Sequence, residues 1–317
     1  WFDVISTAIR NPTLDHQRSI FTNRTLRFDY IQAVGFDFDH TLAVYNTKAL
    51  DDLAERLVAR RLVEEEKIPE AWFEDVPDPS FARKGLILDL DEGVILKTDR
   101  YGHVLRAFHG PKKLTVSAKR KLYGDRDVIP HMPGEQRFIQ VDHAFSKPEI
   151  LLWTGLVGHT EPGERRKLWD RIRHHTDTIH RDGSLKQVIT ANPADFIVAD
   201  PRTETMLTHL RENGKKVFLL TNSEWEYTAS MMNTVLGRGE DAGDSWLELF
   251  DLVVVEAKKP NYFSVTNKNT SKPGPKPTVL IGGNLTEMEQ AIGVSGPEIL
   301  YVGDHIYSDL ISSKKNV

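Results

Sequence analysis

The sequence predicts an α/β protein with a doubly wound, mainly parallel sheet and an inserted α+β region. After about residue 190, short apolar runs alternate with helical patterns, which is typical of strands joined by helices into a parallel sheet. The run AVGF at 33–36 has the same strand pattern, and the amphipathic stretch at 49–66 follows it. Residues 84–108 instead alternate apolar and polar positions, which indicates antiparallel hairpins.

The remaining elements are expected from the same patterns, after a polar lead-in arm at 1–30. Helices are expected at 148–159 and 163–179 in the inserted region, and then at 202–214, 223–237, 284–293 and 308–315, with strands at 215–222, 250–257 and 298–304. Residues 268–278 are rich in Pro, Gly and Lys and are expected to form a loop. We predict a first core segment at 1–58, a cap at 59–190 and a second core segment at 191–317.

The composition is that of a soluble globular protein, and it excludes several kinds of site. The 317 residues are 39% hydrophobic and 27% charged, with a formal net charge of −5 and with Lys and Arg mixed among Asp and Glu. We therefore expect neither a nucleic-acid polymer nor a membrane as a partner. The absence of cysteine excludes disulfides and thiolate sites and is in keeping with a cytoplasmic location. No apolar stretch approaches the roughly 20 residues of a membrane span. The start at Trp1 indicates a trimmed chain.

Polar residues follow four of the predicted strands. They are Asp37 and Asp39 after the first strand, Thr221 and Lys259 after the next two, and Asp304 after the last. Ligands of open α/β sheets bind at the carboxyl ends of the strands, so these side chains are expected to converge. Paired carboxylates repel unless a cation or a shared proton relieves them, and oxygen ligands suit Mg²⁺. Together with a lysine and a hydroxyl, this is an inventory for phosphoryl transfer. The simpler alternative is a polar turn with Asp39 or Thr41 capping a helix.

The sequence resembles the haloacid dehalogenase superfamily, and more narrowly the cytosolic purine 5'-nucleotidase family. The motifs that carry the resemblance are FDFDHTLAVY at 36–45, TNSEWEYT at 221–228, VVEAKKPNYF at 254–263 and YVGDHIYSDL at 301–310, together with GLILDLDEGVILKTDRYGHVL at 85–105 and FIQ at 138–140. The resemblance covers about residues 25–315. It implies a Rossmann-like core with an inserted cap, and it implies a further strand and helix beyond the fourth motif, outside this sequence.

The resemblance also implies roles for the catalytic residues. Asp37 would be the nucleophile and would form an aspartyl-phosphate. Asp39 would protonate the leaving oxygen and then act as the base on water, a role that phosphate esters need and alkyl halides do not. Asp37, the backbone carbonyl of Asp39 and Asp304 would hold Mg²⁺. Thr221, Asn222 and Lys259 would bind the phosphate, and Asp309 would support the metal site.

The expected cap departs from the family wording where the family selects its base. Pro111-Lys112 stands where the family has Phe-Asn, and Val141-Asp142 stands where it has Arg-Asp. Base specificity is therefore left open by the sequence. The candidate cap contacts are Lys112, Arg137, Gln140, Asp142 and His143, and an ordinary solvated surface is an equal alternative for each.

The function that we expect is Mg²⁺-dependent hydrolysis of a nucleoside 5'-monophosphate, with purine as the expected base. The first alternative is a phosphatase of the same fold that acts on a sugar phosphate or another small phosphate ester. The second is a binding protein that keeps the fold without catalysis, although all four motifs are intact. The expected partner is the nucleoside monophosphate, and a homo-oligomer is left open.

Three further patterns are interpreted as structural. The paired Asp89 and Asp91 lie in an alternating strand and are expected on the polar face of a hairpin. The histidines His174, His175 and His180 are expected at a solvated helix end instead of a metal site. Asn284 after GG is expected to cap a helix.

Overall fold

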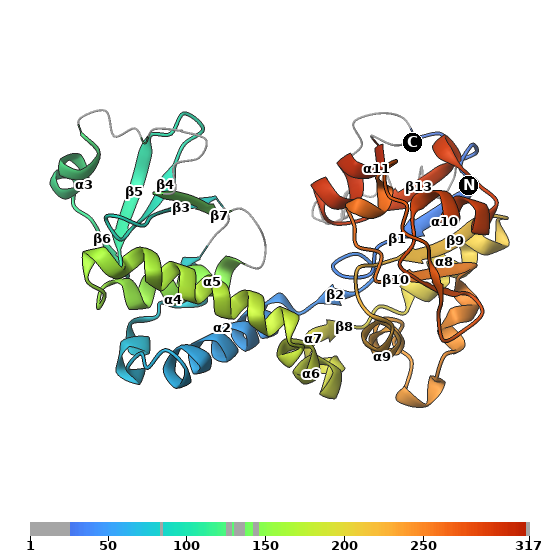
Figure 1. The fold of residues 1–317 in the computed structure, drawn as a ribbon, viewed down its shortest axis with the longest axis horizontal. Helices are drawn as coiled ribbons and strands as arrows, with labels where there is room; N and C mark the ends of the chain where they lie inside the picture. Colours follow the sequence, from blue (N-terminus) through green and yellow to red (C-terminus); the bar gives the residue numbers. More distant parts are fainter. Residues whose placement is uncertain (1–25, 83–84, 125–128, 130–136, 142–145, 315–317) are drawn as a thin grey trace, which may run out of the picture. The chain divides into compact units, whose positions relative to one another are not determined.

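A computed structural model describes residues 26–82, 85–124, 129, 137–141 and 146–314 (Figure 1). The chain divides into two compact units. The first comprises Trp1–Asp37, Thr205–Asn222 and Leu247–Val317, and the second comprises Phe38–Glu204 and Ser223–Trp246. The boundaries that we drew between core and cap stay a prediction.

The first unit is built on a mainly parallel sheet, as predicted. In the described part of the chain its strand order is β11-β12-β10-β9-β1-β13, and all neighbouring strands are parallel except β11 and β12. The bounds are Ala33–Phe36 (β1), Lys216–Leu220 (β9), Leu252–Val255 (β10), Lys272–Pro273 (β11), Val279–Ile281 (β12) and Ile299–Val302 (β13). In the described residues, the α-helices of this unit are Arg202–Glu212 (α8, whose first three residues belong to the second unit), Leu285–Ile292 (α10) and Ser312–Lys314 (α11).

The centre of this sheet is packed around a glycine. Gly35 in β1 pairs with Phe218 in β9, and a Cβ atom at Gly35 would lie 2.1 Å from the ring of Phe218. Only glycine therefore lets the Phe218 ring cover β1. The buried core around Phe218 includes Leu220 and Val254, and it holds the neighbouring strand ends in register.

Several predictions for this unit are confirmed and two are corrected. The strands at 215–222, 250–257 and 298–304 are present, and the Asn284 side chain accepts a hydrogen bond from the Glu287 amide at 3.0 Å, as a helix cap does. The loop prediction for 268–278 is wrong at Lys272–Pro273, where backbone pairing with β12 forms a short edge strand. The helix predicted at 308–315 begins earlier, as a π-helix at Ile306–Ile311.

The second unit combines an antiparallel sheet with helices. The sheet has the order β6-β5-β4-β3-β7, with bounds Leu86–Asp89 (β3), Val94–Thr98 (β4), Val104–His109 (β5), Lys112–Lys113 (β6) and Phe138–Val141 (β7). The helices are Thr47–Glu64 (α2), Val116–Tyr123 (α3), Lys147–Val157 (α4), Arg165–Arg181 (α5), Ser184–Ala191 (α6), Pro193–Phe196 (α7) and Trp225–Val235 (α9). Helices α2, α4 and α5 pack on one another (Figure 1), and Val44–Tyr45 (β2) pairs with Ile197–Val198 (β8).

The predicted hairpin at 84–108 is confirmed, but the prediction that Asp89 lies on its polar face is wrong. Asp89 is fully buried at the end of β3. Its two carboxylate oxygens accept hydrogen bonds from Nε and Nη2 of Arg137 at 2.9 and 2.8 Å, and the Tyr123 hydroxyl donates to Oδ2 at 2.9 Å. A bidentate arginine is the partner that makes a buried carboxylate tolerable.

Replacing Arg137 with methionine is expected to destabilise the protein by about 3 kcal/mol, because Asp89 would keep a buried charge without its bidentate partner. Breaking a fully buried ion pair costs about 3–5 kcal/mol, and the lower value applies here because the Arg137 side chain is 34% exposed. Chemical denaturation measures the loss. Arg106→Met on β5 is the matched control, because Arg106 is exposed; an equal loss in both variants would contradict the assignment.

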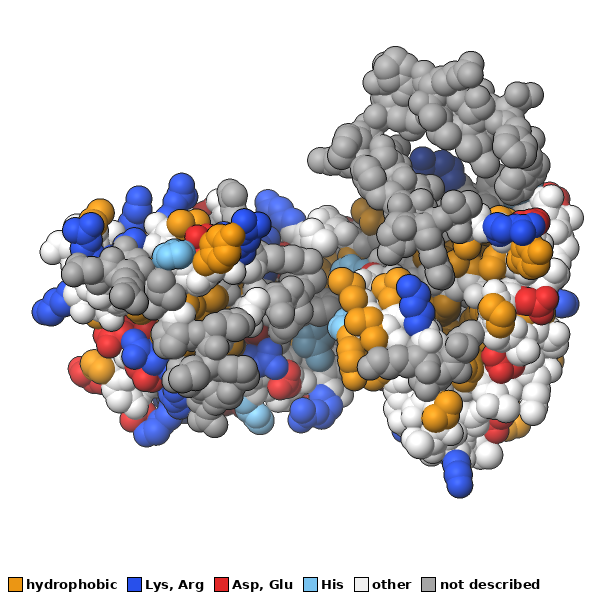
Figure 2. Space-filling model, turned by 90° about the horizontal axis from the view of Figure 1, so that it is seen from above, with side chains coloured by type: hydrophobic (Ala, Val, Ile, Leu, Met, Phe, Trp, Pro, Cys, Tyr) orange, Lys and Arg blue, Asp and Glu red, His pale blue; other side chains and the backbone are white. Residues whose placement is uncertain are grey.

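The described surface is mixed in charge and also exposes several large hydrophobic side chains, such as Val265 and Ile306. On the face shown in Figure 2, the Lys and Arg side chains are interspersed with Asp and Glu on each unit. Within the described residues, no helix combines the length and the apolar character that crossing a bilayer requires.

Candidate active site

The polar residues predicted to converge in the first unit do so at the carboxyl edge of its sheet. Asp37 follows β1, and its backbone N–H donates to the Val302 carbonyl of β13 at 2.9 Å, so the carboxylate is held beside the next strand end. Lys259 follows β10, and its ammonium group lies 2.8 Å from Oδ2 of Asp37. Two strand ends far apart in the sequence therefore meet in one ion pair.

Lys259 uses all three of its ammonium donors inside the protein. Its Nζ atom lies 2.8 Å from both Asp37 Oδ2 and Asp309 Oδ1, and 2.9 Å from the Tyr301 hydroxyl. The side chain is only 2% exposed. The Tyr301 hydroxyl in turn donates to the Leu220 carbonyl at 3.0 Å, and burial raises the pKa of Tyr301 well above its ordinary value. Tyr301 is therefore a neutral spacer that fixes the lysine, and the sequence analysis did not identify it.

The side chain of Asn222 makes hydrogen bonds to the backbone of Lys259 and so fixes its position. The Lys259 amide donates to Asn222 Oδ1 at 2.6 Å, and Asn222 Nδ2 donates to the Lys259 carbonyl at 3.2 Å. Thr221, one residue earlier, is fully buried at the end of β9 and accepts a backbone hydrogen bond from Ala257 at 3.0 Å. Both residues thus lie at the predicted strand end, and the amide of Asn222 is used to position Lys259.

Three carboxylates of this edge could hold a metal ion. Asp37, Asp304 and Asp309 each offer a carboxylate oxygen, and these oxygens lie within 4.8 Å of one another. Asp37 and Asp309 are buried, whereas Asp304 is exposed and faces solvent. An all-oxygen set of this kind suits a hard divalent cation such as Mg²⁺, which would also relieve the repulsion among the three charges.

The approach of Asp309 to this cluster depends on Gly303 and on the π-helix. A Cβ atom at Gly303 would lie 2.6 Å from the Cβ atom of Asp309. The wider turn of the π-helix carries Asp309, whose Oδ2 accepts a hydrogen bond from the His305 amide at 3.1 Å. The π-helix at Ile306–Ile311 therefore contains Asp309, the residue whose carboxylate joins Asp37 and Asp304 at the sheet edge.

Asp39 lies at the start of the second unit, in a tight turn. The amides of Thr41 and Ala43 both donate to the Phe38 carbonyl, at 3.2 and 2.9 Å. His40, which lies between Phe38 and Thr41 in the chain, has a φ of 57°, in the left-handed region. The carboxylate of Asp39 accepts hydrogen bonds from the hydroxyls of Tyr45 at 2.5 Å and Ser223 at 2.7 Å, so each of its oxygens has a donor.

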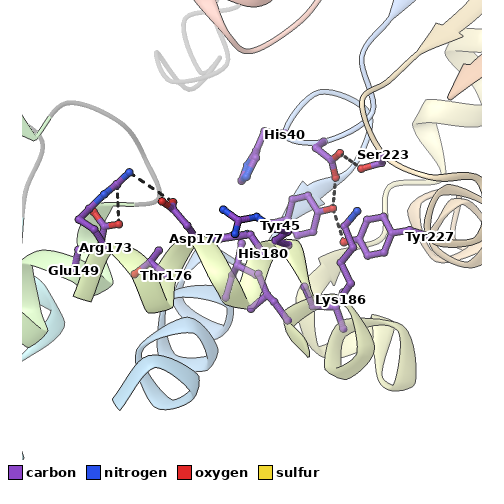
Figure 3. A pocket seen from close by; sticks show the side chains of 15 residues that line it. His40, Tyr45, Glu149, Arg173, Thr176, Asp177, His180, Lys186, Ser223 and Tyr227 are labelled. Carbon is purple, nitrogen blue, oxygen red and sulfur yellow. Dashed lines mark hydrogen bonds and ion pairs between the residues drawn. The ribbon is translucent and has the colours of Figure 1, made fainter. Parts of the chain in front are cut away.

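A cavity of about 590 Å³ opens beside Asp39 within the second unit (Figure 3). Its polar lining includes a row on α5, whose members are Arg173, Thr176, Asp177 and His180. The other lining residues are Asp39, His40, Tyr45, Leu50, Glu149, Arg181, Leu185, Lys186, Ile189, Ser223 and Tyr227. The cavity thus joins Asp39 to a polar wall that could recognise a ligand.

Comparison with known proteins identifies the family. The profile of the 5' nucleotidase family matches residues 20–317. The chain belongs to the 5' nucleotidase family. A 5'-nucleotidase domain-containing protein of Dictyostelium discoideum is 28% identical over 325 residues, which cover 95% of this chain and 54% of that relative. The chain therefore spans about half the length of this curated relative.

Charged or titratable residues of α5 line the cavity, and this placement was not predicted from the sequence. Arg173, Asp177 and His180 recur at four and then three residues, which places them on one face of the helix. That spacing was the available signal. The prediction of a solvated helix end is wrong for His175, which is 2% exposed and lies 3.3 Å from Glu66 through Nε2.

Ion pairs and burial set the charge states of the cavity residues on and beside α5. The buried Glu149 accepts a hydrogen bond from Nη1 of Arg173 at 2.8 Å, and Arg173 also lies 3.6 Å from Asp177. Burial raises the pKa of Glu149, although Arg173 opposes the effect. Desolvation lowers the pKa of His180, which also lines the cavity. A neutral histidine both donates and accepts a hydrogen bond.

The cap residues predicted from the sequence lie elsewhere. Lys112 on β6 and Gln140 on β7 are exposed on the antiparallel sheet, and Arg137 is paired with Asp89. Asp142 and His143 lie outside the described residues. None of the described candidates lines the cavity, and their contact with substrate stays a prediction.

Proposed function

We propose that this chain hydrolyses nucleoside 5'-monophosphates, with purines preferred, through an aspartyl-phosphate on Asp37, as a Mg²⁺-dependent member of the haloacid dehalogenase superfamily. The observation that carries the proposal is the cluster of Asp37, Lys259, Asp304 and Asp309 at the carboxyl edge of a parallel sheet. A carboxylate nucleophile beside a buried ammonium group and an acidic metal cluster is the inventory that phosphoryl transfer needs.

In the proposed mechanism, Asp37 is the nucleophile that attacks phosphorus and Asp39 is the general acid and base. Asp37 attacks phosphorus, the bond to the ribose oxygen breaks, and that oxygen takes a proton from Asp39, which stands two residues further along the chain. Water then attacks the phosphorus of the aspartyl-phosphate and gives a proton to Asp39. Phosphate leaves, so Asp37 is again a carboxylate and Asp39 is again protonated. When bound, Mg²⁺ supplies positive charge for the phosphate oxygens, and Asp37 and Asp304 are the residues that we assign to hold it.

The cavity beside Asp39 is the proposed place of the nucleoside. Its polar wall contains the acceptor Asp177, the donor Arg173 and His180, which can do both. Such a mixed set suits the edge of a purine, which carries both donors and acceptors. A sugar phosphate would fill less of a cavity of about 590 Å³.

Steady-state assays of the purified protein test the function. We expect IMP, GMP or AMP to have a higher kcat/KM than sugar phosphates, and we expect EDTA to abolish turnover and Mg²⁺ to restore it. A panel in which nucleotides are the poorest substrates would instead favour the small-phosphate alternative. If the protein hydrolyses no phosphate monoester, the result would support the second alternative, a binding protein that keeps the fold without catalysis.

Asp177→Ala is expected to lower kcat/KM for purine 5'-monophosphates about ten- to a hundredfold, because it removes a charged acceptor for the base. Turnover of p-nitrophenyl phosphate, which has no base, is expected to stay unchanged. Asp170→Ala is the control, since Asp170 is an exposed aspartate on the same helix outside the cavity lining. Equal losses on both substrates would argue against a base contact at Asp177.

A further inference from the structure

A cavity of about 440 Å³ lies in the first unit and has no part in the proposed hydrolysis. Its walls come from the turn at 256–258 after β10, the segment at 268–272 that enters β11, and the turn at 281–283 after β12. Because β10 and β12 are parallel, both turns lie at the carboxyl edge of the sheet. Ligands of open α/β sheets bind at this edge, so the cavity is a candidate binding site.

The lining of this cavity is positively charged. It contains Lys258, Lys268 and Lys272 against the single carboxylate of Glu256, which leaves two net positive charges. Among the residues that the structure describes, none of the three ammonium groups has a partner in an ion pair or a hydrogen bond. The adjacent Lys259, in contrast, uses all three of its donors. Like charges that share a cavity repel, so a bound anion would stabilise this arrangement.

The segment that carries two of these lysines is fixed to the turn after β12. The side-chain amide of Asn267 donates to the Gly283 carbonyl at 3.1 Å, and that of Asn284 donates to the Asn269 carbonyl at 2.8 Å. Lys272 belongs to β11, whose backbone pairs with β12. The lysines therefore stand on a backbone that is already ordered, which lowers the entropic cost of binding a ligand.

The turn after β10 supplies an observation that is independent of charge. Glu256 and Lys258 have φ angles of 51° and 60°, in the left-handed region that residues other than glycine rarely adopt. Ala257 between them is buried, and its amide donates to the Thr221 carbonyl at 3.0 Å. Residues in such sparsely populated conformations cluster at ligand-binding sites. The strained turn and the unpaired lysines thus face the same cavity.

We infer that this cavity binds a small anion with two linked phosphate groups, at a site separate from the aspartates around Asp37. Lysine ammonium groups are compact charges that suit phosphate, whose charge is spread over several oxygens. Asn269 and Thr270 line the same cavity, and their side chains can donate hydrogen bonds to phosphate oxygens. A cavity of about 440 Å³ is larger than one phosphate group fills and falls in the usual range for small ligands. The inference goes beyond the proposed function and does not depend on it.

Calorimetric titration of the purified protein with inorganic pyrophosphate in EDTA tests the inference. Lys268→Met and Lys272→Met are each expected to weaken binding about tenfold, the size of one lost hydrogen bond between charged groups. Both side chains are exposed, so the fold is expected to survive. Lys216→Met is the matched control, because Lys216 lies in the same unit outside the cavity and pairs with Asp251 at 3.0 Å. Its loss is expected to weaken binding less than about twofold.

Glu256→Gln gives a second readout that misfolding cannot imitate. Its replacement removes the only carboxylate of the cavity lining, so we expect pyrophosphate to bind about threefold more tightly. Inorganic phosphate, with one phosphate group, is expected to bind at least about tenfold more weakly than pyrophosphate. Succinate is expected to bind more weakly still, because it presents carboxylates instead of phosphates.

Three outcomes would overturn the inference. The first is no binding of pyrophosphate at millimolar concentration. The second is binding that Lys268→Met and Lys272→Met leave unchanged, or that Lys216→Met weakens equally, since the anion would then lie elsewhere or respond only to overall charge. The third is succinate binding as tightly as pyrophosphate, which would contradict a phosphate site. Failure of the proposed function gives a different result, because a protein that hydrolyses no monoester would still bind pyrophosphate in this titration.

Discussion

Replacing Asp37 with asparagine is expected to lower turnover of a nucleoside 5'-monophosphate by about 10⁴-fold or more, which is the scale seen when a covalent nucleophile is removed. The amide cannot form an aspartyl-phosphate, and it no longer offers a charged oxygen to the acidic cluster. Because Asp309 still neutralises Lys259 at 2.8 Å, the fold is expected to survive. Turnover and the far-ultraviolet circular dichroism spectrum together check both expectations.

Asp91→Asn is the matched control for this experiment. Asp91 belongs to the second pair of aspartates in the sequence, at the turn after β3, and it lies 3.4 Å from Arg166 on the outside of the second unit. Its loss is expected to leave kcat/KM unchanged. Substantial activity in Asp37→Asn, with Asp91→Asn behaving identically, would remove Asp37 from the chemistry.

Lys259→Met is expected to destabilise the first unit by about 3–5 kcal/mol, because two carboxylates would stay close together without their cation. The distances of 2.8 Å to Asp37 and to Asp309, with the lysine side chain 2% exposed, place this pair in the buried class. Urea denaturation in EDTA measures the loss. Added Mg²⁺ is expected to recover part of the stability, since it would share the same carboxylates.

Lys258→Met is the control that distinguishes the loss of the Lys259 ion pairs from a general loss of one positive charge. Lys258 is the neighbouring residue, but it is exposed, so its replacement is expected to change stability by less than about 0.5 kcal/mol. Similar losses in the two variants would show that the buried triad of Asp37, Lys259 and Asp309 does not stabilise the unit as described.

The sequence was sufficient for the strands and for the polar residues at their ends. Strand ends in a parallel sheet meet at one edge, so the convergence of Asp37, Lys259 and Asp304 could be predicted from order alone. Tyr301 could not, because a tyrosine in an apolar strand looks like core until its hydroxyl is seen between Lys259 and the Leu220 carbonyl. The edge strand at Lys272–Pro273 was missed because proline is depleted from strands.

The cavity wall was missed for a different reason. Interleaved arginines and histidines on α5 are also what a solvated helix shows, and the pattern does not say which face is covered. Only the packing of α5 on α2 and α4 shows that His175 is buried and that Asp177 lines the cavity. Asp89 was misassigned in the same way, since its partner Arg137 stands 48 residues away.

Trapping the covalent intermediate is the most direct test of the central claim, which is that Asp37 receives the phosphoryl group. A single turnover with a ³²P-labelled nucleoside 5'-monophosphate would be quenched in acid, reduced with borohydride and mapped by mass spectrometry. We expect acid-stable label before reduction and homoserine at position 37 after it. An active enzyme that shows no labelled protein, or homoserine at position 39 instead, would contradict the account.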